Sequence, residues 1–249
     1  MILDPSEPTG PMVTAGVLTA TGTVSEPAVR APEPIEYLGM VGFFALSLLL
    51  LSYILADPGT GGPISLAMVL MGYIASDLFS GLVHWGFDTW GSPQTPWLGP
   101  AFIHHFRVHH DDAKDITRHG FIATNGNNCL ATTPVLAMAC MLPASLYGVG
   151  PLRILLLAMC LGVFATNQCH KWAHQDQVSP VVAWLQRWHL ILPADHHDVH
   201  HHHPYLGHYC ITSGWLNRGL DYLGFFRGLE RLITSITGVM PRENDLAAS

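Results

Sequence analysis

ISLAMVLMGYIASDLFSGLVHWGFD, residues 64–88, joins a long apolar run to a histidine and an acid. The run covers 64–83 and carries one charged side chain, Asp77. About 20 apolar residues are enough for a helix to cross the hydrocarbon layer of a bilayer. His84 follows at once, and Asp88 lies about one helical turn further on. The stretch therefore predicts a membrane-spanning helix that ends in groups able to bind a metal.

Three further apolar runs repeat this pattern, at about 37–56, 129–147 and 152–166. The run 129–147 holds Pro134 and Pro143, which membrane helices tolerate near their ends and at kinks. The run 152–166 is long enough only if its helix continues through Gln168 towards His170. We expect an all-α integral membrane protein with about four transmembrane helices. Two spans plus two re-entrant or interfacial helices are the alternative.

The remaining segments set the domain organisation. Residues 1–34 have no basic or apolar signal sequence and few bulky apolar residues, which predicts a disordered N-terminal leader. We expect residues 35–242 to form one membrane domain with a cytosolic histidine-rich cap, and residues 243–249 to form a flexible C-terminal tail. Within the domain, 215–237 has apolar residues at helical spacing with arginines between them. This pattern predicts an amphipathic helix, either interfacial or packed on the domain.

The composition excludes several classes of protein. Charged residues are 12% and hydrophobic residues 49%, which argues for residence in a membrane. With a net charge of −7 and no basic run, no nucleic-acid partner is expected. Five cysteines form no CxxC pair, so we interpret them as packing residues in a reducing compartment.

Two short turns rich in glycine and proline, 57–63 and 148–151, predict that the four spans form two antiparallel helical hairpins. Four spans then place every histidine on one side of the membrane. Of eleven Lys and Arg residues, only Arg153 falls on the other side. Because positive charge favours the cytosolic side, the histidines are expected to face the cytosol. We expect this membrane to be the bacterial inner membrane, or the endoplasmic reticulum in a eukaryote.

Fifteen of the sixteen histidines fall into four clusters, each where an apolar segment meets a polar one. The clusters are His84; His104, His105, His109, His110 and His119; His170 and His174; and His189, His196, His197, His200, His201, His202 and His203. Imidazole suits iron, copper, zinc and nickel, and one structural zinc needs only four ligands. The excess of histidines therefore indicates a polyhistidine metal centre beside a membrane.

The spacing of these residues narrows the chemistry. His170 and His174 share one helix face, as do neighbouring members of the His197–His201 cluster. Asp77 lies on the same face as His84, and an acid within a span is most simply the acceptor that orients a ligand histidine. No HExxH motif occurs, and no glutamate stands three residues before a histidine, which disfavours a zincin protease and a carboxylate di-iron bundle.

Two iron ions that activate O2 fit many imidazoles at a membrane surface, where the bilayer supplies an alkyl or acyl chain. A membrane metal transporter is the alternative of another class. Its ligands would be distributed along a path through the spans, whereas Asp77 alone is central to a span here.

A series of motifs gives a resemblance that runs from about residue 37 to 242. The motifs are Ser80-Gly-Leu-Val-His84-Trp-Gly-Phe-Asp88-Thr-Trp-Gly91, His109-His110, Ile116-Thr-Arg-His119, Thr124-Asn-Gly-Asn-Asn-Cys129, Asn167-Gln-Cys-His170-Lys-Trp-Ala-His174, His196-His-Asp-Val-His-His201 and Cys210-Ile-Thr-Ser-Gly-Trp-Leu-Asn217. In this order they closely resemble the plasmanylethanolamine desaturase family, the Kua or CarF type of lipid desaturase, in a bacterial form. A plant desaturase acting on phosphatidylglycerol is a more distant likeness.

The resemblance implies that 35–242 is a membrane lipid desaturase domain. Such an enzyme uses two iron ions, O2 and two electrons to form the vinyl-ether double bond of plasmalogens in the sn-1 O-alkyl chain of plasmanyl phospholipids. Desaturation or hydroxylation of ester-linked acyl chains is the alternative within this chemistry. The electrons would come from a separate protein, cytochrome b5-like or ferredoxin-like, because no flavin, haem or ferredoxin motif is visible.

The same resemblance assigns the site residues. The metal ligands it implies are His84, His109, His110, His170, His174, His197, His200 and His201. A second set of candidates would either bind the metal or hydrogen-bond to the residues that do. They are Asp77, Asp88, His119, His189 and His196. His104, His105, His202 and His203 fall outside the family pattern and are expected at the surface. Arg107, Arg118 and Lys171 adjoin histidine motifs, which makes them candidate contacts for the substrate phosphate, although a positive-inside bias explains them equally well.

Overall fold

The computed structural model describes residues 29–96 and 98–242. The chain divides after Arg30 into two units, and the first is described only at residues 29–30. The fold is therefore that of the second unit. Of the two terminal segments predicted from the sequence, residues 1–28 of the leader and all of the tail, 243–249, lie outside the described residues.

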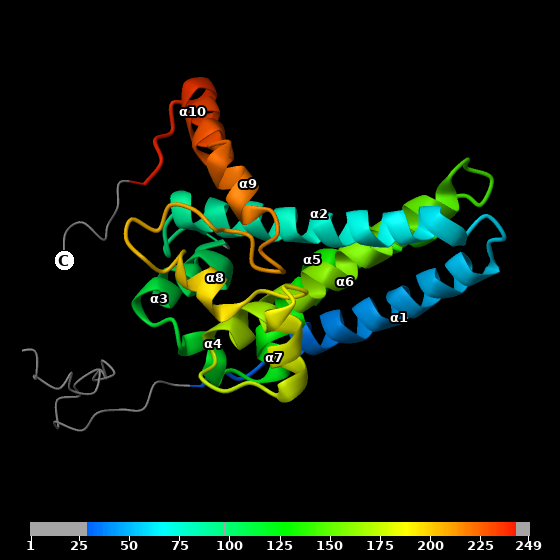
Figure 1. Ribbon diagram of the computed structural model, residues 1–249, viewed down its shortest axis with the longest axis horizontal. Helices are drawn as coiled ribbons and strands as arrows, with labels where there is room; N and C mark the ends of the chain where they lie inside the picture. Colours follow the sequence, from blue (N-terminus) through cyan, green and yellow to red (C-terminus); the bar gives the residue numbers. More distant parts are fainter. Residues whose placement is uncertain (1–28, 97, 243–249) are drawn as a thin grey trace, which may run out of the picture. The chain divides into compact units, whose positions relative to one another are not determined.

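Four long helices run beside one another in this unit (Figure 1), namely α1 (Pro34–Ala56), α2 (Gly62–Thr89), α5 (Phe121–Met141) and α6 (Val149–His174). No strand occurs in the described residues, so the all-α prediction is confirmed. Helix α6 continues past Gln168 to His174, as its predicted span requires. Among the described helices, α1, α2 and α6 are long and apolar enough to cross a membrane.

The order of packing is α1–α5–α6–α2, with α1 also touching α6. The predicted short turn joins the first two spans, but they pack mainly on other helices, α1 on α5 and α2 on α6. The second predicted hairpin, α5 with α6, is a packed pair. Glycines allow α2 and α6 to pack closely. A Cβ on Gly72 of α2 would lie only 2.5 Å from the Leu155 carbonyl oxygen of α6, too close for any larger residue. A Cβ on Gly162 would lie 2.1 Å from the Ser76 hydroxyl. Such small residues let helix backbones approach closely in membranes.

Helix α5 begins eight residues before the predicted start of its run, Cys129, and ends at Met141 instead of 147. Its first turns are polar, and their side chains bond to the neighbouring helix. Asn128 donates to the Val163 carbonyl at 2.8 Å, and Asn167 of α6 donates to the Thr124 carbonyl at 2.9 Å. The helix stops because Pro143 disfavours helical geometry in the residue before it.

Short helices build the histidine end of the unit (Figure 1). They are the π-helix η1 (Gly99–Ile103), α3 (His104–Asp111), α4 (Asp115–Arg118), α7 (Pro180–Arg187), α8 (Ala194–Asp198), α9 (Asn217–Tyr222) and α10 (Phe225–Thr237). The single helix predicted over 215–237 is wrong: it is broken into α9 and α10 at Gly224, whose φ of 60° is left-handed. Phe226 packs on Trp85, so α10 contacts the end of α2.

The segment 207–217 ties this end to the spans. The Ile211 amide donates to the Ser80 hydroxyl of α2 at 3.0 Å. The hydroxyls of Thr212 and Thr166 of α6 lie 2.7 Å apart. Because Ile211 and Thr212 are both buried, this segment fills the space between α2 and α6 where their histidines begin.

Candidate metal centre

Two groups of side chains gather donor atoms at the ends of α2 and α6. The first group is His109, His170, His174, His197 and His201, and the second group is His84, Asp88, His110 and His200. Within each group the donor atoms all lie within 4.8 Å of one another. The eight histidines that the resemblance named as ligands are thus all brought together, and Asp88 joins them.

Neighbouring residues divide between the two groups. His109 of α3 belongs to the first and His110 to the second, and His201 and His200 divide in the same way. Adjacent residues on a helix point about 100° apart, so His109 and His110 of α3 reach into different groups, and His200 and His201 do the same from the turn after α8. The two groups therefore lie side by side. The rings of His170, from the first group, and His84, from the second, have centroids 6.0 Å apart.

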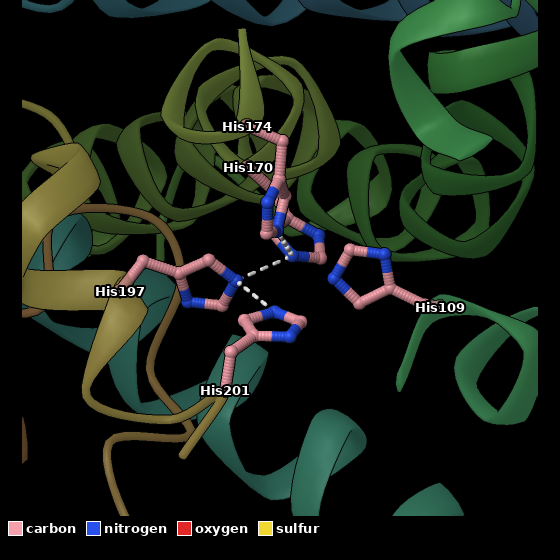
Figure 2. Close-up of side chains that lie close together, drawn as sticks. All are labelled: His109, His170, His174, His197 and His201. Atoms are coloured by element: carbon pink, nitrogen blue, oxygen red, sulfur yellow. Dashed lines mark hydrogen bonds between the residues drawn. The ribbon is translucent and has the colours of Figure 1, made fainter. Parts of the chain in front are cut away.

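The first group has the geometry of a shared ligand sphere (Figure 2). The Nε2 atom of His197 lies 2.8 Å from that of His170 and 3.1 Å from that of His201. The Nε2 atoms of His170 and His174 are 3.2 Å apart. Nitrogens bound at about 2.1 Å to one ion, at right angles to each other, are about 3 Å apart. The spacing therefore fits a single metal ion bound by several imidazoles.

The second group surrounds a carboxylate. One oxygen of Asp88 lies 3.3 Å from His84 Nε2, and the other lies 3.3 Å from His110 Nε2. His200 Nε2 lies 3.6 Å from the carboxylate. These three nitrogens and both oxygens are buried, yet they make no hydrogen bond. Buried polar atoms are almost always paired, so this set of donors fits a metal ion.

Backbone carbonyls fix the rings of the second group. The Nδ1 atom of His84 lies 3.0 Å from the Tyr209 carbonyl oxygen, and that of His200 lies 2.8 Å from the Gly207 carbonyl oxygen. A carbonyl accepts a hydrogen bond only from a protonated Nδ1. In the neutral ring this leaves the lone pair on Nε2, where it can bind a metal ion. Sequence reasoning missed both contacts, because a backbone acceptor leaves no mark in residue type.

The surroundings keep the imidazoles neutral. Burial, and after it the neighbouring histidines, hold the pKa of His109 and of His197 well below the usual range. Burial likewise lowers the pKa of His200, and it lowers the pKa of His201 to about 3. Neutral imidazole is the form that binds metal, so these histidines are ready for metal binding at neutral pH.

Comparison with known proteins shows the family of this chain. Residues 73–244 match the lipid desaturase domain. The chain belongs to the lipid desaturase family. It is 49% identical over 222 residues to plasmanylethanolamine desaturase of Myxococcus xanthus, covering 89% of this chain and 78% of that protein. It is 47% identical over 192 residues to plasmanylethanolamine desaturase 1 of Mus musculus, covering 74% and 70%.

A plant relative is more distant: the chloroplastic fatty acid desaturase 4 of Arabidopsis thaliana is 35% identical over 176 residues, covering 69% of this chain and 52% of that protein. No solved structure matches the chain. The protein is accordingly a membrane lipid desaturase, and hence an oxidoreductase, whose histidine groups are placed to bind metal.

Asp77 of the desaturase lies in neither group, and the partner predicted for it, a ligand histidine, is wrong. Its buried carboxylate accepts hydrogen bonds from the backbone N–H groups of Ser213, Gly214 and Leu216, at 2.8, 2.9 and 3.2 Å. The acid therefore holds the segment 207–217 against α2, and the same segment carries the Tyr209 carbonyl that His84 contacts.

Three other second-place residues also lie outside the two groups. His119 Nε2 is 3.0 Å from Asp115, and His196 Nε2 is 3.1 Å from the Gly214 carbonyl oxygen. His189 is exposed. Four further histidines, expected at the surface, are likewise exposed and belong to neither group. They are His104, His105, His202 and His203.

The three basic residues predicted to contact the substrate phosphate form hydrogen bonds to other groups of the protein. Arg107 donates to the Phe87 carbonyl at 3.2 Å, and Arg118 donates to Asp112 and Asp115 at 2.6 and 2.8 Å. Lys171 donates to the carbonyl of His119. Lys171 and Arg118 thus help to position the segment around His119, and a phosphate contact stays a prediction for all three.

Proposed function

We propose that this lipid desaturase forms the vinyl-ether double bond of plasmalogens. It would remove one hydrogen from each of C1 and C2 of the sn-1 O-alkyl chain of plasmanylethanolamine. In this reaction O2 accepts those two hydrogens together with two electrons and two protons, and leaves as two molecules of water. The two relatives named plasmanylethanolamine desaturase, at 49% and 47% identity, support this substrate.

The position of the donor groups carries the proposal. His84 lies 22 residues after Gly62, the start of α2. At about 1.5 Å per residue this is about 33 Å, close to the thickness of the hydrocarbon layer of about 30 Å. C1 and C2 are the first carbons of the chain, next to the glycerol. A metal centre at the membrane surface is therefore at the depth of these carbons, and not at the depth of carbons in the middle of a chain.

Two iron ions are the cofactor we assign to the two groups, the first bound by five histidines and the second by three histidines and Asp88. When bound, iron supplies the O2 activation that breaking an unactivated C–H bond requires. The protein holds the ligand rings in place through the Tyr209 and Gly207 carbonyls.

The distribution of charge supports an orientation with the histidine end in the cytosol. Of the eleven Lys and Arg residues, Arg153 alone lies near the turn between α5 and α6, at the other end of the helices. There it donates to the Leu142 carbonyl at 2.7 Å. We further propose that α5 is the fourth span and that a cytosolic electron-transfer protein, cytochrome b5-like or ferredoxin-like, supplies the electrons.

Lipid analysis in a host without plasmalogens tests the proposal. The host is given an alkylglycerol, so that it makes plasmanyl lipids, and expresses the wild-type protein, His174→Ala or the surface control His203→Ala. We expect acid-labile vinyl ethers with the wild type and with His203→Ala, and none with His174→Ala.

Other outcomes contradict the proposal. Wild-type protein that is present in the membrane with bound iron, yet yields no vinyl ether, refutes the assigned reaction. New double bonds in ester-linked chains would show the acyl-chain alternative. A hydroxylated ether chain would show hydroxylation in place of desaturation.

A further inference from the structure

A groove of about 630 Å³ lies between α1, α2 and α6. It exists because α1 packs on α5 and α6 while α2 packs on α6, which leaves one side of α6 uncovered between α1 and α2. Its walls are almost entirely apolar, with Leu51 from α1, Val69 from α2 and Leu161 from α6. Volumes of about 300–1,000 Å³ are typical of pockets for small molecules.

The groove does not lead to the metal groups. Leu157, Leu161 and Ala165 line it from one face of α6. Leu161 precedes His170 by nine residues, which at about 100° per residue is about 180° around the helix axis. The direct route between α2 and α6 is closed, because a Cβ on Gly162 would already lie 2.1 Å from Ser76 Oγ. A chain in the groove therefore stops short of the ligand histidines, because Tyr73 of α2 and the contact of Gly162 with Ser76 close the groove at that end.

The two ends of the groove differ in character. One end lies at the turn between α1 and α2, where Thr60, Gly61 and Ser65 line it. The other end is Tyr73, whose hydroxyl donates to the Leu190 carbonyl at 2.5 Å and whose ring packs edge-on against Trp215 at 5.4 Å. The groove thus begins at the membrane surface opposite the histidines and ends at an aromatic wall within the membrane.

Its length matches one leaflet. Ile154 and Ala165, the outermost lining residues of α6, are eleven residues apart, or about 16 Å along the helix. Half of the hydrocarbon thickness of about 30 Å is about 15 Å. A lipid with its head group beside Thr60 would fill the groove with one chain down to Tyr73. The first carbons of that chain would lie beside Ser65, 19 residues or about 28 Å along α2 from His84.

We propose that this groove binds one acyl chain of a phospholipid from the leaflet opposite the metal centre, as a resident lipid that is not desaturated. The inference rests on the proposed function only in that the histidine end is taken as the reacting end. Hydrocarbon is the one medium that reaches this surface of the spans, and its dispersion contacts with Val69 and Leu161 would replace those that a neighbouring helix makes elsewhere in the bundle.

Lipid counting on variants of the full chain tests the site. Val69→Trp and Leu161→Trp each place a large ring in the groove, at positions whose side chains are 48% and 42% exposed. Leu66→Trp is the matched control, because Leu66 is on the same helix, is 73% exposed and does not line the groove. Each protein is purified from a host that makes only ester-linked lipids, washed with detergent, and examined by native mass spectrometry for retained diacyl phospholipid.

We expect one retained phospholipid on the wild type and on Leu66→Trp, and a several-fold lower occupancy on both groove variants. Equal retention on all four proteins, or no retention on the wild type, would overturn the proposal. The vinyl-ether products are the second measurement, made separately with the same variants in the host that is given an alkylglycerol. If the groove instead held the reacting chain, Val69→Trp and Leu161→Trp would shift the product towards shorter chains, which would also overturn it. A wild type that makes no vinyl ether refutes the proposed function and leaves the lipid count as a separate result.

Discussion

Replacing Asp77 by alanine is expected to destabilise the protein and to lower its iron content. The effect on iron would be indirect, because the Asp77 carboxylate bonds to backbone N–H groups and not to a ligand histidine. The carboxylate is completely buried and accepts from three backbone N–H groups of the segment 207–217. That segment supplies the Tyr209 carbonyl that orients His84. Loss of the acid would therefore affect both the fold and the metal groups.

The size of the effect follows from the bonds that are lost. A buried donor left without a partner costs about 1–3 kcal/mol, so three such donors in Asp77→Ala cost about 3 kcal/mol or more. In Asp77→Asn an amide oxygen still accepts from Ser213 and Gly214, but the NH2 group faces the N–H of Leu216. This variant loses one bond, at a cost of about 1–3 kcal/mol. Asp57→Asn, in the exposed turn where Asp57 accepts from the Gly59 amide, is the control and is expected to cost about 0.5 kcal/mol or less.

Thermal unfolding in detergent and metal analysis of the purified proteins measure both effects. For a chain of this size about 1 kcal/mol corresponds to about 2–4 °C, so Asp77→Ala is expected to unfold about 6–12 °C below the wild type. Asp77→Asn should lie between Asp77→Ala and Asp57→Asn. If Asp77→Ala and Asp57→Asn unfold at the same temperature and bind the same amount of iron, the role assigned to Asp77 is refuted.

Three further predictions concern the metal groups and the opposite end of the helices. His197→Ala removes one donor of the first group and is expected to weaken iron binding at least about tenfold, whereas the exposed His203→Ala should bind as the wild type does; equal binding by both would contradict the grouping. Asp88→Asn removes the only carboxylate of the second group and should lower the iron content of the purified protein towards half, so an unchanged iron content would exclude Asp88 as a ligand. Arg153→Gln deprives the Leu142 carbonyl of its donor and should cost about 1–3 kcal/mol in thermal unfolding while leaving iron per folded chain unchanged; a loss of iron would show that Arg153 acts on the site.

The histidines that meet at the site could be predicted because local geometry and motif order both mark them. His170 and His174 lie on one face of a helix, and the structure places both in the first group. The division of His109 and His110 between two groups could not be predicted. It depends on how α3 lies against α2 and on how the His109 ring meets His170 of α6, and residues that are far apart in sequence set that packing.

The start of α5 was missed for a related reason. Asn125 and Asn128 resemble loop residues when only the local sequence is considered. In the structure Asn125 is completely buried and donates to Gln168, and Asn128 lies 3.3 Å from Asn167, both on α6. Polar side chains remain in a membrane helix when a neighbouring helix satisfies them, and that neighbour is invisible in the sequence of α5.

The two metal groups depend on different parts of the chain. The first group takes its rings from α6, α3, α8 and the turn after α8. In the second group, His84 and Asp88 come from α2, and both orienting carbonyls come from the segment 207–217. Asp77 holds that same segment to that same helix. Damage at Asp77 should therefore reach the second group before the first, so that a partly loaded Asp77→Asn protein retains the ion of the five-histidine group. Spectra of the bound iron distinguish this from an equal loss at both groups, which would mean that Asp77 supports the whole bundle and not one half of the site.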